Sequence, residues 1–224
     1  MLVKASFLLV FFTGLCKADT LCSWLWQQTE TTRMKALNST FVTGVRDGTL
    51  HPTSFGEYVL QDIVYIYKSA LSFEIAAKKL AGGTLKSFLE HKVTSSQQFG
   101  DVELKEWQLN NASAIILGNA FKSYTDHLLN VSNEYDPIYA VLVSIPCERL
   151  WPWIGEELNK IPHSYGPFAE WIGLNFDPTY KGWQDMEQWV DDMYARGFIR
   201  KDIAMKIYAE SMNDEVECFN SIKP

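Results

Sequence analysis

The sequence predicts an all-α protein, a single bundle of seven or eight helices. Apolar residues recur three and four positions apart through most of the chain, which is the period of an amphipathic helix. No segment alternates apolar and polar residues long enough to predict a strand, and no internal repeat or long linker divides the chain. With 224 residues, 47% hydrophobic and 21% charged, the chain can bury the core of one domain and has no signature of disorder.

The first eighteen residues have the pattern of a secretory signal peptide. Lys4 gives a positive start, residues 5–12 are apolar, and residues 16–18 resemble a cleavage site. The alternative is a retained membrane anchor, but the apolar run is shorter than the roughly 20 residues that span a bilayer. We therefore expect residues 1–18 to be removed and residues 19–224 to form the helical domain, secreted from the cell.

Turn and cap residues set the expected helices of the N-terminal half. Asp47-Gly48 predicts a turn, and Ser54 is a plausible N-cap with Glu57 three positions later. Gly82-Gly83 ends the long helix that starts there. The expected ranges are 21–37, 52–80, 85–96 and 102–109.

Proline and glycine residues shape the expectation for the C-terminal half. Asp136-Pro137 begins a helix that must accommodate Pro146 and Pro152, so we expect kinks or a break there, with irregular backbone at 145–147 facing a cavity. Gly197 ends a later helix. The other expected ranges are 112–129, 167–174, 181–195 and 201–220.

Charge and histidine content exclude some classes of partner. The net charge is −7, and removal of Lys4 and Lys17 with the signal peptide lowers it to −9, so a nucleic-acid partner is not expected. The four histidines show none of the spacings of zinc or di-iron sites, and we expect no metal and no cofactor. The 14% of aromatic residues suit either a ring-lined pocket or a bulky core.

Export makes the remaining cysteines and the Asn-x-Ser/Thr sequences informative. Cys22, Cys147 and Cys218 remain after residue 18, and in an oxidising compartment an odd number means either one disulfide and a free thiol or no disulfide. The three glycosylation sequences, which support secretion only weakly, begin at Asn38, Asn111 and Asn130.

A few residues could carry chemistry, although each also has an ordinary structural explanation. Cys147 is either a buried structural thiol, a disulfide half or a nucleophile. Asp62 and Tyr65 share one helix face, where Asp62 is either solvated at the helix edge or an acceptor for polar ligand groups. Glu215 belongs to a solvated acidic face on composition alone, and Tyr124 is equally ambiguous.

Five segments in the same order resemble the TenA family, the thiaminase II proteins, which share the haem-oxygenase-like helical fold. The helix Phe55-x-x-Tyr58-Val59-Leu60-Gln61-Asp62-x-x-Tyr65 and the pair Pro146-Cys147 are the most specific of them. The similarity extends over about residues 22–220. Gly155-Glu156 follows Pro146-Cys147 in the same segment, and the other segments are Phe41 to Leu50, Ser123-Tyr124-Thr125-x-His127 and Trp171-Ile172-Gly173.

The resemblance implies roles for these residues. Cys147 matches the nucleophile that adds to the electron-poor pyrimidine ring of thiamin or of a thiamin breakdown product. Glu215 matches the acid/base, and Asp62 matches the carboxylate that holds the ring nitrogen and the exocyclic amine. Tyr65 and Tyr124 match pocket tyrosines. An ordinary thiol is only slightly ionised at neutral pH, so such a nucleophile requires an activating partner.

The sequence also departs from the family pattern. Trp151 and Asn175 stand where the family usually has tyrosines in the substrate pocket. The C-terminal Glu-x-x-Phe-Trp becomes Glu215-x-x-Cys218-Phe219, so Glu217 competes with Glu215 as the acid/base. Because Cys218 replaces an aromatic residue and Cys22 lies at the other end of the chain, we expect a disulfide between them that leaves Cys147 free.

The expected function is that of a secreted thiaminase-like enzyme. It would cleave the pyrimidine-methylene C–N bond of thiamin or a related aminopyrimidine through a covalent cysteine adduct, with water (thiaminase II type) or an organic base (thiaminase I type) as acceptor. The alternatives are a secreted, non-catalytic binder of a pyrimidine or another flat ligand and, least favoured, a metal-dependent oxidase. The resemblance suggests a homo-oligomer, often a tetramer; no membrane association is expected after signal cleavage.

Overall fold

The computed structural model describes residues 20–223, and over that range it is helical and contains no strand. The all-α class is confirmed, but residues 20–223 form ten α-helices rather than seven or eight. Two short 3₁₀ helices, η1 and η2, lie at Ala112–Ala114 and Gly166–Phe168. The α-helices are α1 Leu21–Gln28, α2 Glu30–Leu37, α3 Thr40–Asp47, α4 Pro52–Lys78, α5 Thr84–Glu106, α6 Asn119–Glu134, α7 Ile138–Leu158, α8 Ala169–Asn175, α9 Gly182–Ala195 and α10 Lys201–Asn220.

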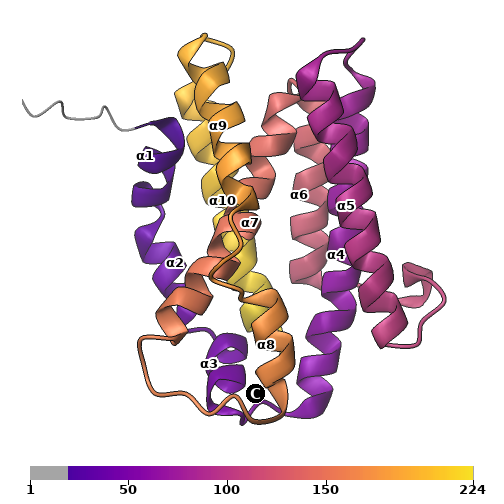
Figure 1. Ribbon diagram of the computed structural model, residues 1–224, viewed down its shortest axis with the longest axis vertical. Coiled ribbons are helices and arrows are strands. Elements are labelled where there is room, and N and C mark those ends of the chain that lie inside the picture. The colour runs from indigo at the N-terminus through magenta and orange to yellow at the C-terminus, as the bar shows by residue number, and fades with distance from the viewer. Residues whose placement is uncertain (1–19, 224) are drawn as a thin grey trace, which may run out of the picture.

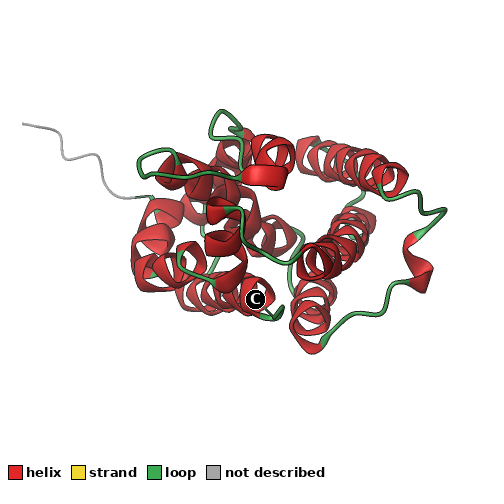
Figure 2. Cartoon of the chain, turned by 90° about the horizontal axis from the view of Figure 1, so that it is seen from below, coloured by secondary structure: helices red, strands yellow, loops and turns green. Residues whose placement is uncertain are grey.

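The long helices lie side by side along the longest axis of the molecule (Figure 1). Helix α4 packs against α5, α6 and α7, while α10 packs against α6 and α7, with α9 on the far side of α7. Helices α1 and α2 cover α9 and α10. Viewed from below, the helices are seen largely end-on (Figure 2). From these contacts, the buried faces of α4, α6, α7 and α10 form the centre of the bundle. These helices carry the side chains of the candidate functional site.

The first predicted helix is divided in two. Thr29 separates α1 from α2, and its hydroxyl donates a hydrogen bond to the Leu25 carbonyl at 3.0 Å. Such side-chain bonding competes with the continuation of a helix. Helix α3 was not predicted; Ser39 caps its start, and Gly48 ends it with φ of 66°. This left-handed residue confirms the turn expected at Asp47-Gly48. Glycine is suited to the position because it adopts a positive φ without steric cost.

Two segments predicted as separate helices form the single helix α5. Gly100 lies inside it, where a Cβ atom would stand 3.0 Å from the Tyr67 ring. The glycine thus permits close packing of α5 on α4 and does not end the helix. Helix α6 begins at Asn119, later than the predicted residue 112, because η1 and a loop precede it.

Helix α7 passes through Pro146 and Pro152 without a break. The expected irregular backbone at 145–147 is therefore wrong. Each proline lacks an N–H group, so the carbonyls of Leu142 and Glu148 lack their usual helical donor. Most of α7 is buried between α4, α6, α9 and α10, and this tertiary packing maintains the helix.

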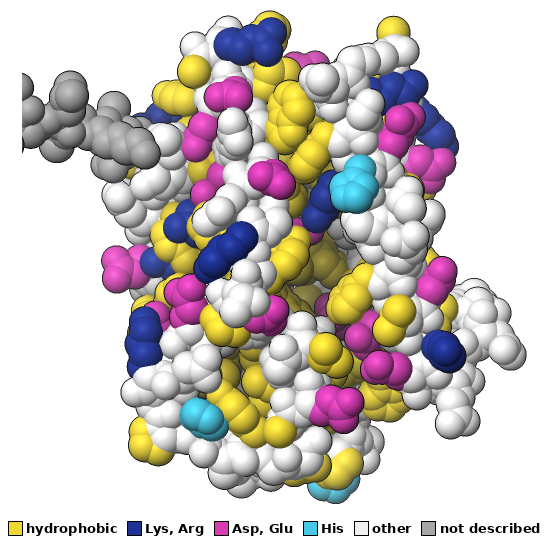
Figure 3. All heavy atoms as spheres, in the orientation of Figure 1, with side chains coloured by type: hydrophobic (Ala, Val, Ile, Leu, Met, Phe, Trp, Pro, Cys, Tyr) yellow, Lys and Arg dark blue, Asp and Glu magenta, His cyan; other side chains and the backbone are white. Residues whose placement is uncertain are grey.

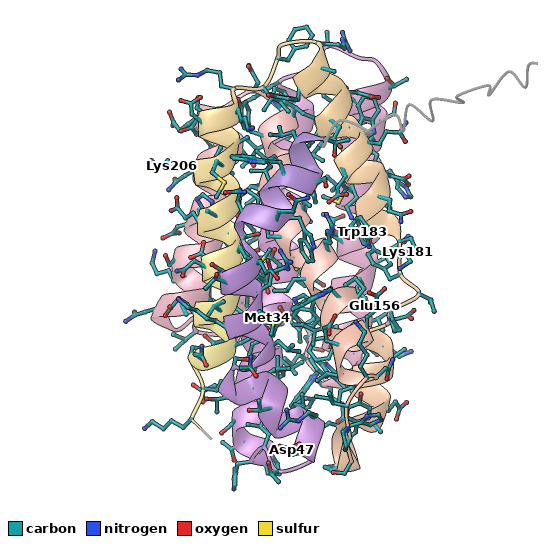
Figure 4. The ribbon with its side chains drawn as sticks, turned by 90° about the vertical axis from the view of Figure 1, so that its left-hand side faces the viewer. Met34, Asp47, Glu156, Lys181, Trp183 and Lys206 are labelled. Carbon is teal, nitrogen blue, oxygen red and sulfur yellow. The ribbon has the colours of Figure 1, made fainter. Side chains whose placement is uncertain are left out.

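Helices α9 and α10 match the predicted ranges to within one residue. Lys181, just before α9, lies beside Glu156 of α7, with 3.4 Å between Nζ and Oε1 (Figure 4). Both side chains are about half exposed, so this ion pair contributes little to stability. The ion pair does show that the segment between α8 and α9 lies against the surface of α7.

The Cys22–Cys218 disulfide is not formed; Cys22, Cys147 and Cys218 are all free thiols. Cys22 Sγ lies 3.8 Å from the carbonyl oxygen of Glu187 in α9. Helix α1 places Cys22 against α9, whereas Cys218 lies near the C-terminal end of α10.

Several sequence predictions concern features that the described residues do not test. The predicted signal peptide lies outside residues 20–223. Asn38, Asn111 and Asn130 are all exposed, as glycosylation requires, and their modification remains a prediction. Within the described part of the chain, no helix is both long enough and apolar enough to cross a membrane.

We predict that Gly155→Ala destabilises the fold. A Cβ atom at Gly155 would lie 1.8 Å from the carbonyl oxygen of Phe176, where α7 meets the end of α8. Because backbone atoms would have to move, we expect a loss of about 1–3 kcal/mol in the free energy of unfolding. Denaturant unfolding measures it.

Gly173→Ala is the matched control for this prediction. Gly173 lies in α8, and a Cβ atom added there would have no neighbouring atom within 4 Å. Alanine at this position should leave stability unchanged or raise it by up to about 1 kcal/mol, because alanine favours helix. Equal unfolding curves for Gly155→Ala and wild type would contradict the tight contact of α7 with α8.

Candidate functional site

A cavity of about 420 Å³ opens between α4, α5, α7 and α8. In the space-filling view, the face that carries α5 and α9 is hollowed near its middle, and hydrophobic side chains gather there (Figure 3). Cys147 lines this cavity together with three other residues predicted from the sequence, Asp62, Tyr65 and Trp151. Asn175 lines it as well. Helices far apart in the sequence therefore bring most of the predicted residues to one cavity.

Glu215 lies behind the cavity at the centre of a hydrogen-bonded group. Tyr124 donates its hydroxyl to Oε1 of Glu215 at 2.9 Å, and Trp151 donates Nε1–H to Oε2 at 3.1 Å. Tyr65 in turn donates to the Tyr124 hydroxyl at 3.2 Å. The Cys147 thiol is close enough to Glu215 and Tyr65 to affect the pKa values of both groups. Four helices, α4, α6, α7 and α10, supply these side chains.

This arrangement decides the protonation states of the thiol and the carboxyl group. Burial raises the pKa of Cys147, and the nearby carboxylate of Glu215 raises it further, so the resting group is a neutral thiol. Burial also raises the pKa of Glu215, whereas hydrogen bonds from Trp151, Tyr124 and Cys147 lower it in part. The thiol can therefore ionise only by passing its proton to a neighbour, and Glu215 is within reach as the acceptor.

Asp62 presents a carboxyl group to the cavity from α4. Burial raises its pKa well above the usual range, and the charges of Glu215 and Glu103 raise it further. A neutral carboxylic acid donates one hydrogen bond and accepts another. It therefore suits a ligand that presents a ring nitrogen next to an amino group.

The structure distinguishes between Glu215 and Glu217, which the sequence left as competing candidates for the acid/base. Glu215 is 3% exposed and faces the thiol, whereas Glu217 is exposed on the opposite side of α10. The Asn175 side chain donates to the Trp171 carbonyl at 3.0 Å, so its amide nitrogen is partly committed to its own helix. Trp151 has a role that the sequence did not reveal, as a donor to Glu215.

Aromatic side chains pack around Trp151 on the buried side of the cavity. The rings of Trp151 and Phe176 lie 5.2 Å apart between centroids, and those of Trp151 and Phe219 lie 5.8 Å apart. Tyr58 and Phe41 continue this layer, with centroids 3.9 Å apart. The high aromatic content thus serves both a bulky core and the wall of a pocket, which excludes water from the carboxyl groups.

Sequence reasoning missed a polar group on the outer side of the cavity. Glu148 forms an ion pair with Lys92 of α5 and accepts a hydrogen bond from the hydroxyl of Tyr180. All three residues line the cavity. Glu148 could have been found from its position next to Cys147, but nothing in the sequence marks Lys92 or Tyr180. No group of His, Cys, Asp and Glu among residues 20–223 is arranged to hold a metal ion.

We predict that Tyr124→Phe shifts the pH dependence of any reaction in which Glu215 is the base. The substitution removes a hydrogen bond that stabilises the Glu215 carboxylate, so the pKa of Glu215 should rise further. If the ionised carboxylate is the base, kcat/KM falls as pH drops through this pKa, and the acidic limb should move to higher pH. A pH–rate profile measures the shift.

Tyr67→Phe is the control for the pH profile. Tyr67 donates its hydroxyl to Asp101 on the surface, between α4 and α5, and does not line the cavity. Its profile should coincide with that of the wild type. An unshifted limb in Tyr124→Phe would show that Glu215 does not govern the acidic limb.

Two curated relatives are similar to the chain in sequence. The chain is 29% identical over 182 residues to an aminopyrimidine aminohydrolase of Halalkalibacterium halodurans, which covers 75% of this chain and 78% of that protein. It is 32% identical over 152 residues to an aminopyrimidine aminohydrolase of Bacillus subtilis, covering 63% of this chain and 61% of that protein. Both of these relatives are thus hydrolases of aminopyrimidines.

Solved structures share the fold. A TenA family transcription regulator from Silicibacter sp. TM1040 superposes with a TM-score of 0.74 at 17% identity, over 91% of this chain and 96% of that chain. A TenA homologue from P. horikoshii gives a TM-score of 0.73 at 20% identity, over 89% and 96% of the two chains. The model of the TENA/THI-4/PQQC family matches residues 26–183, which include α4, α7 and Cys147. The chain therefore belongs to the TENA/THI-4/PQQC family.

Proposed function

We propose that the protein is a thiaminase II-like hydrolase that cleaves the pyrimidine-methylene C–N bond of thiamin or a related aminopyrimidine through a covalent adduct with Cys147. The observation that carries the proposal is a cavity thiol within reach of Glu215, which Tyr124 and Trp151 hold in place. The aminopyrimidine aminohydrolases among its relatives support the substrate class.

Binding comes first. The neutral carboxyl group of Asp62 donates a hydrogen bond to a ring nitrogen and accepts one from the adjacent amino group. This pairing fixes the pyrimidine in its plane and places one ring carbon near the sulfur. The aromatic wall around Trp151 excludes water, which strengthens these polar contacts.

The covalent step uses the proton relay between Cys147 and Glu215. The thiol proton passes to Glu215 while sulfur bonds to the electron-poor ring carbon, and Glu215 delivers that proton to the neighbouring ring nitrogen. The ring is now electron-rich, so it expels the leaving group: the methylene C–N bond breaks and its electron pair leaves with the nitrogen. Expulsion of the leaving group is not possible from the unmodified, electron-poor ring, so it requires the preceding addition of sulfur.

Water completes the cycle. It adds to the exocyclic methylene carbon and gives one proton to solvent through the site carboxylates. The ring nitrogen then loses its proton, the carbon–sulfur bond breaks, and Cys147 regains a proton. The products are the hydroxymethylpyrimidine and the leaving amine or thiazole, so every atom and electron is accounted for.

Substrate loss and product identity test this proposal. Purified protein is incubated with thiamin, and separately with 4-amino-5-aminomethyl-2-methylpyrimidine, and the products are identified by liquid chromatography and mass spectrometry. Hydroxymethylpyrimidine formed in buffer supports hydrolysis. A pyridine adduct formed only with added pyridine would instead favour base exchange. Binding without consumption of either compound would favour a non-catalytic binding protein.

We further propose that the protein is exported. The charged, apolar and cleavage-like segments of residues 1–18 and the exposure of the three sequence-predicted glycosylation sites support this location. The full chain, expressed in eukaryotic cells, should accumulate in the medium with Asp19 at its N-terminus and lose mass on deglycosylation. Retention in the cell with an intact N-terminus would contradict export.

A further inference from the structure

The cavity extends outward from Cys147 to an opening that carries unusual surface residues. Phe99 of α5 and Leu174 of α8 line the cavity and are 43% and 63% exposed. Tyr180, in the loop before α9, lines it too and is 41% exposed. Large apolar side chains gathered at the mouth of a cavity indicate a surface that a ligand covers.

The cavity is also larger than one pyrimidine ring requires. Its volume of about 420 Å³ falls within the range of pockets that enclose drug-sized ligands. Asp62 and Cys147 occupy the inner part, where the pyrimidine is held. The outer part between α5 and α8 is left for whatever is attached to the methylene carbon.

Charge at this outer part favours a cation. The Lys92 ammonium is paired with the Glu148 carboxylate, so their charges largely cancel. Asp177 lines the same part of the cavity, and hydrogen bonds from the backbone and hydroxyl of Thr179 lower its pKa. The positive charge of Lys181 also lowers this pKa, but Lys181 is itself paired with Glu156. The Asp177 carboxylate is therefore ionised at neutral pH and gives the opening a negative charge.

We propose that Phe99, Leu174, Asp177 and Tyr180 form a leaving-group subsite that selects a flat, positively charged ring and disfavours a phosphate ester. The inference rests on the proposed function, because it places the pyrimidine at Asp62. The apolar side chains cover the faces of the ring, and Asp177 attracts its charge. The subsite would thus favour thiamin, with its cationic second ring, over thiamin monophosphate.

Two substrates that differ only in the leaving group test the apolar part. Phe99→Ala and Leu174→Ala should each lower kcat/KM for thiamin by about tenfold. The same variants should leave kcat/KM for 4-amino-5-aminomethyl-2-methylpyrimidine within about twofold of wild type, because ammonia makes no contact with a ring subsite. Ile116→Ala is the matched control, since Ile116 is 89% exposed and lies outside the cavity.

Asp177→Asn tests the charge. Its amide oxygen can still accept the hydrogen bonds from Thr179, so the local turn should persist. In the wild type, kcat/KM should be higher for thiamin than for thiamin monophosphate. Asp177→Asn should bring these two kcat/KM values closer together. Asp202→Asn, which changes an exposed carboxylate away from the cavity, should not change it.

The outcomes separate this inference from the proposed function. Equal losses on both pyrimidines, no loss on either, or a wild-type preference for thiamin monophosphate would overturn the subsite while leaving the hydrolase intact. Failure of wild type to cleave any of the three compounds would overturn the proposed function and the subsite with it.

Discussion

Cys147→Ser should reduce thiamin cleavage by at least about a thousandfold, as removal of a covalent nucleophile does in other enzymes. A serine hydroxyl ionises far less readily than a thiol, and burial and the nearby carboxyl groups already oppose ionisation at this position. Serine is nearly isosteric with cysteine, so folding should be preserved. Initial rates of hydroxymethylpyrimidine formation, with thermal unfolding of both proteins, measure the effect.

Cys22→Ala is the matched control for the nucleophile. Cys22 is also a free, buried thiol, but it lies on α1 beside α9 and does not line the cavity. Its activity per folded molecule should equal that of the wild type. Intact-mass spectrometry during turnover should detect the pyrimidine adduct in wild type and not in Cys147→Ser. Full activity in Cys147→Ser would exclude the covalent mechanism.

Glu215→Gln should lower kcat by about a hundred- to ten-thousandfold, the range for loss of a general acid–base group. Glutamine nearly matches glutamate in shape but cannot take the thiol proton. Its amide group also cannot accept from both Tyr124 and Trp151, because one of its two ends is a donor. Single-turnover kinetics should show that adduct formation itself is slowed.

Glu217→Gln is the matched comparison, because the sequence left Glu217 as the other candidate for the acid/base. Glu217 lies two positions farther along α10 and is exposed. The Glu217→Gln variant should therefore retain wild-type kinetics. If Glu217→Gln lost activity while Glu215→Gln retained it, the assignment of the acid/base would be reversed.

Much of the fold could be predicted from local patterns. Helices α9 and α10 have strong apolar periodicity and clear ends, and their predicted ranges agree with the structure to within one residue. Errors arose where tertiary packing overrode local signals. Pro146 and Pro152 suggested a break, yet α7 is surrounded by other helices and continues through both. The break predicted between residues 96 and 102 does not occur, and Gly100 inside α5 allows this helix to approach Tyr67.

The candidate site was predicted in part. Resemblance to the family supplied Cys147, Asp62 and Glu215 as residue choices, and the structure places them around one cavity and its inner wall. The expected disulfide is not formed: Cys22 lies beside Glu187 of α9, and both Cys22 and Cys218 are free thiols. A pairing inferred from the two ends of a chain contains no information about distance.

By itself the sequence determined the helical class, the family and the chemical types of the principal site residues, because these depend on periodicity and on ordered motifs. Only the tertiary structure shows that Glu215 faces the thiol and accepts a hydrogen bond from Trp151. It also places Lys92, Glu148 and Tyr180 at the border of the cavity. These features depend on how α4, α5, α7 and α10 pack together. Contacts between residues distant in the chain set them, and no local pattern encodes such contacts.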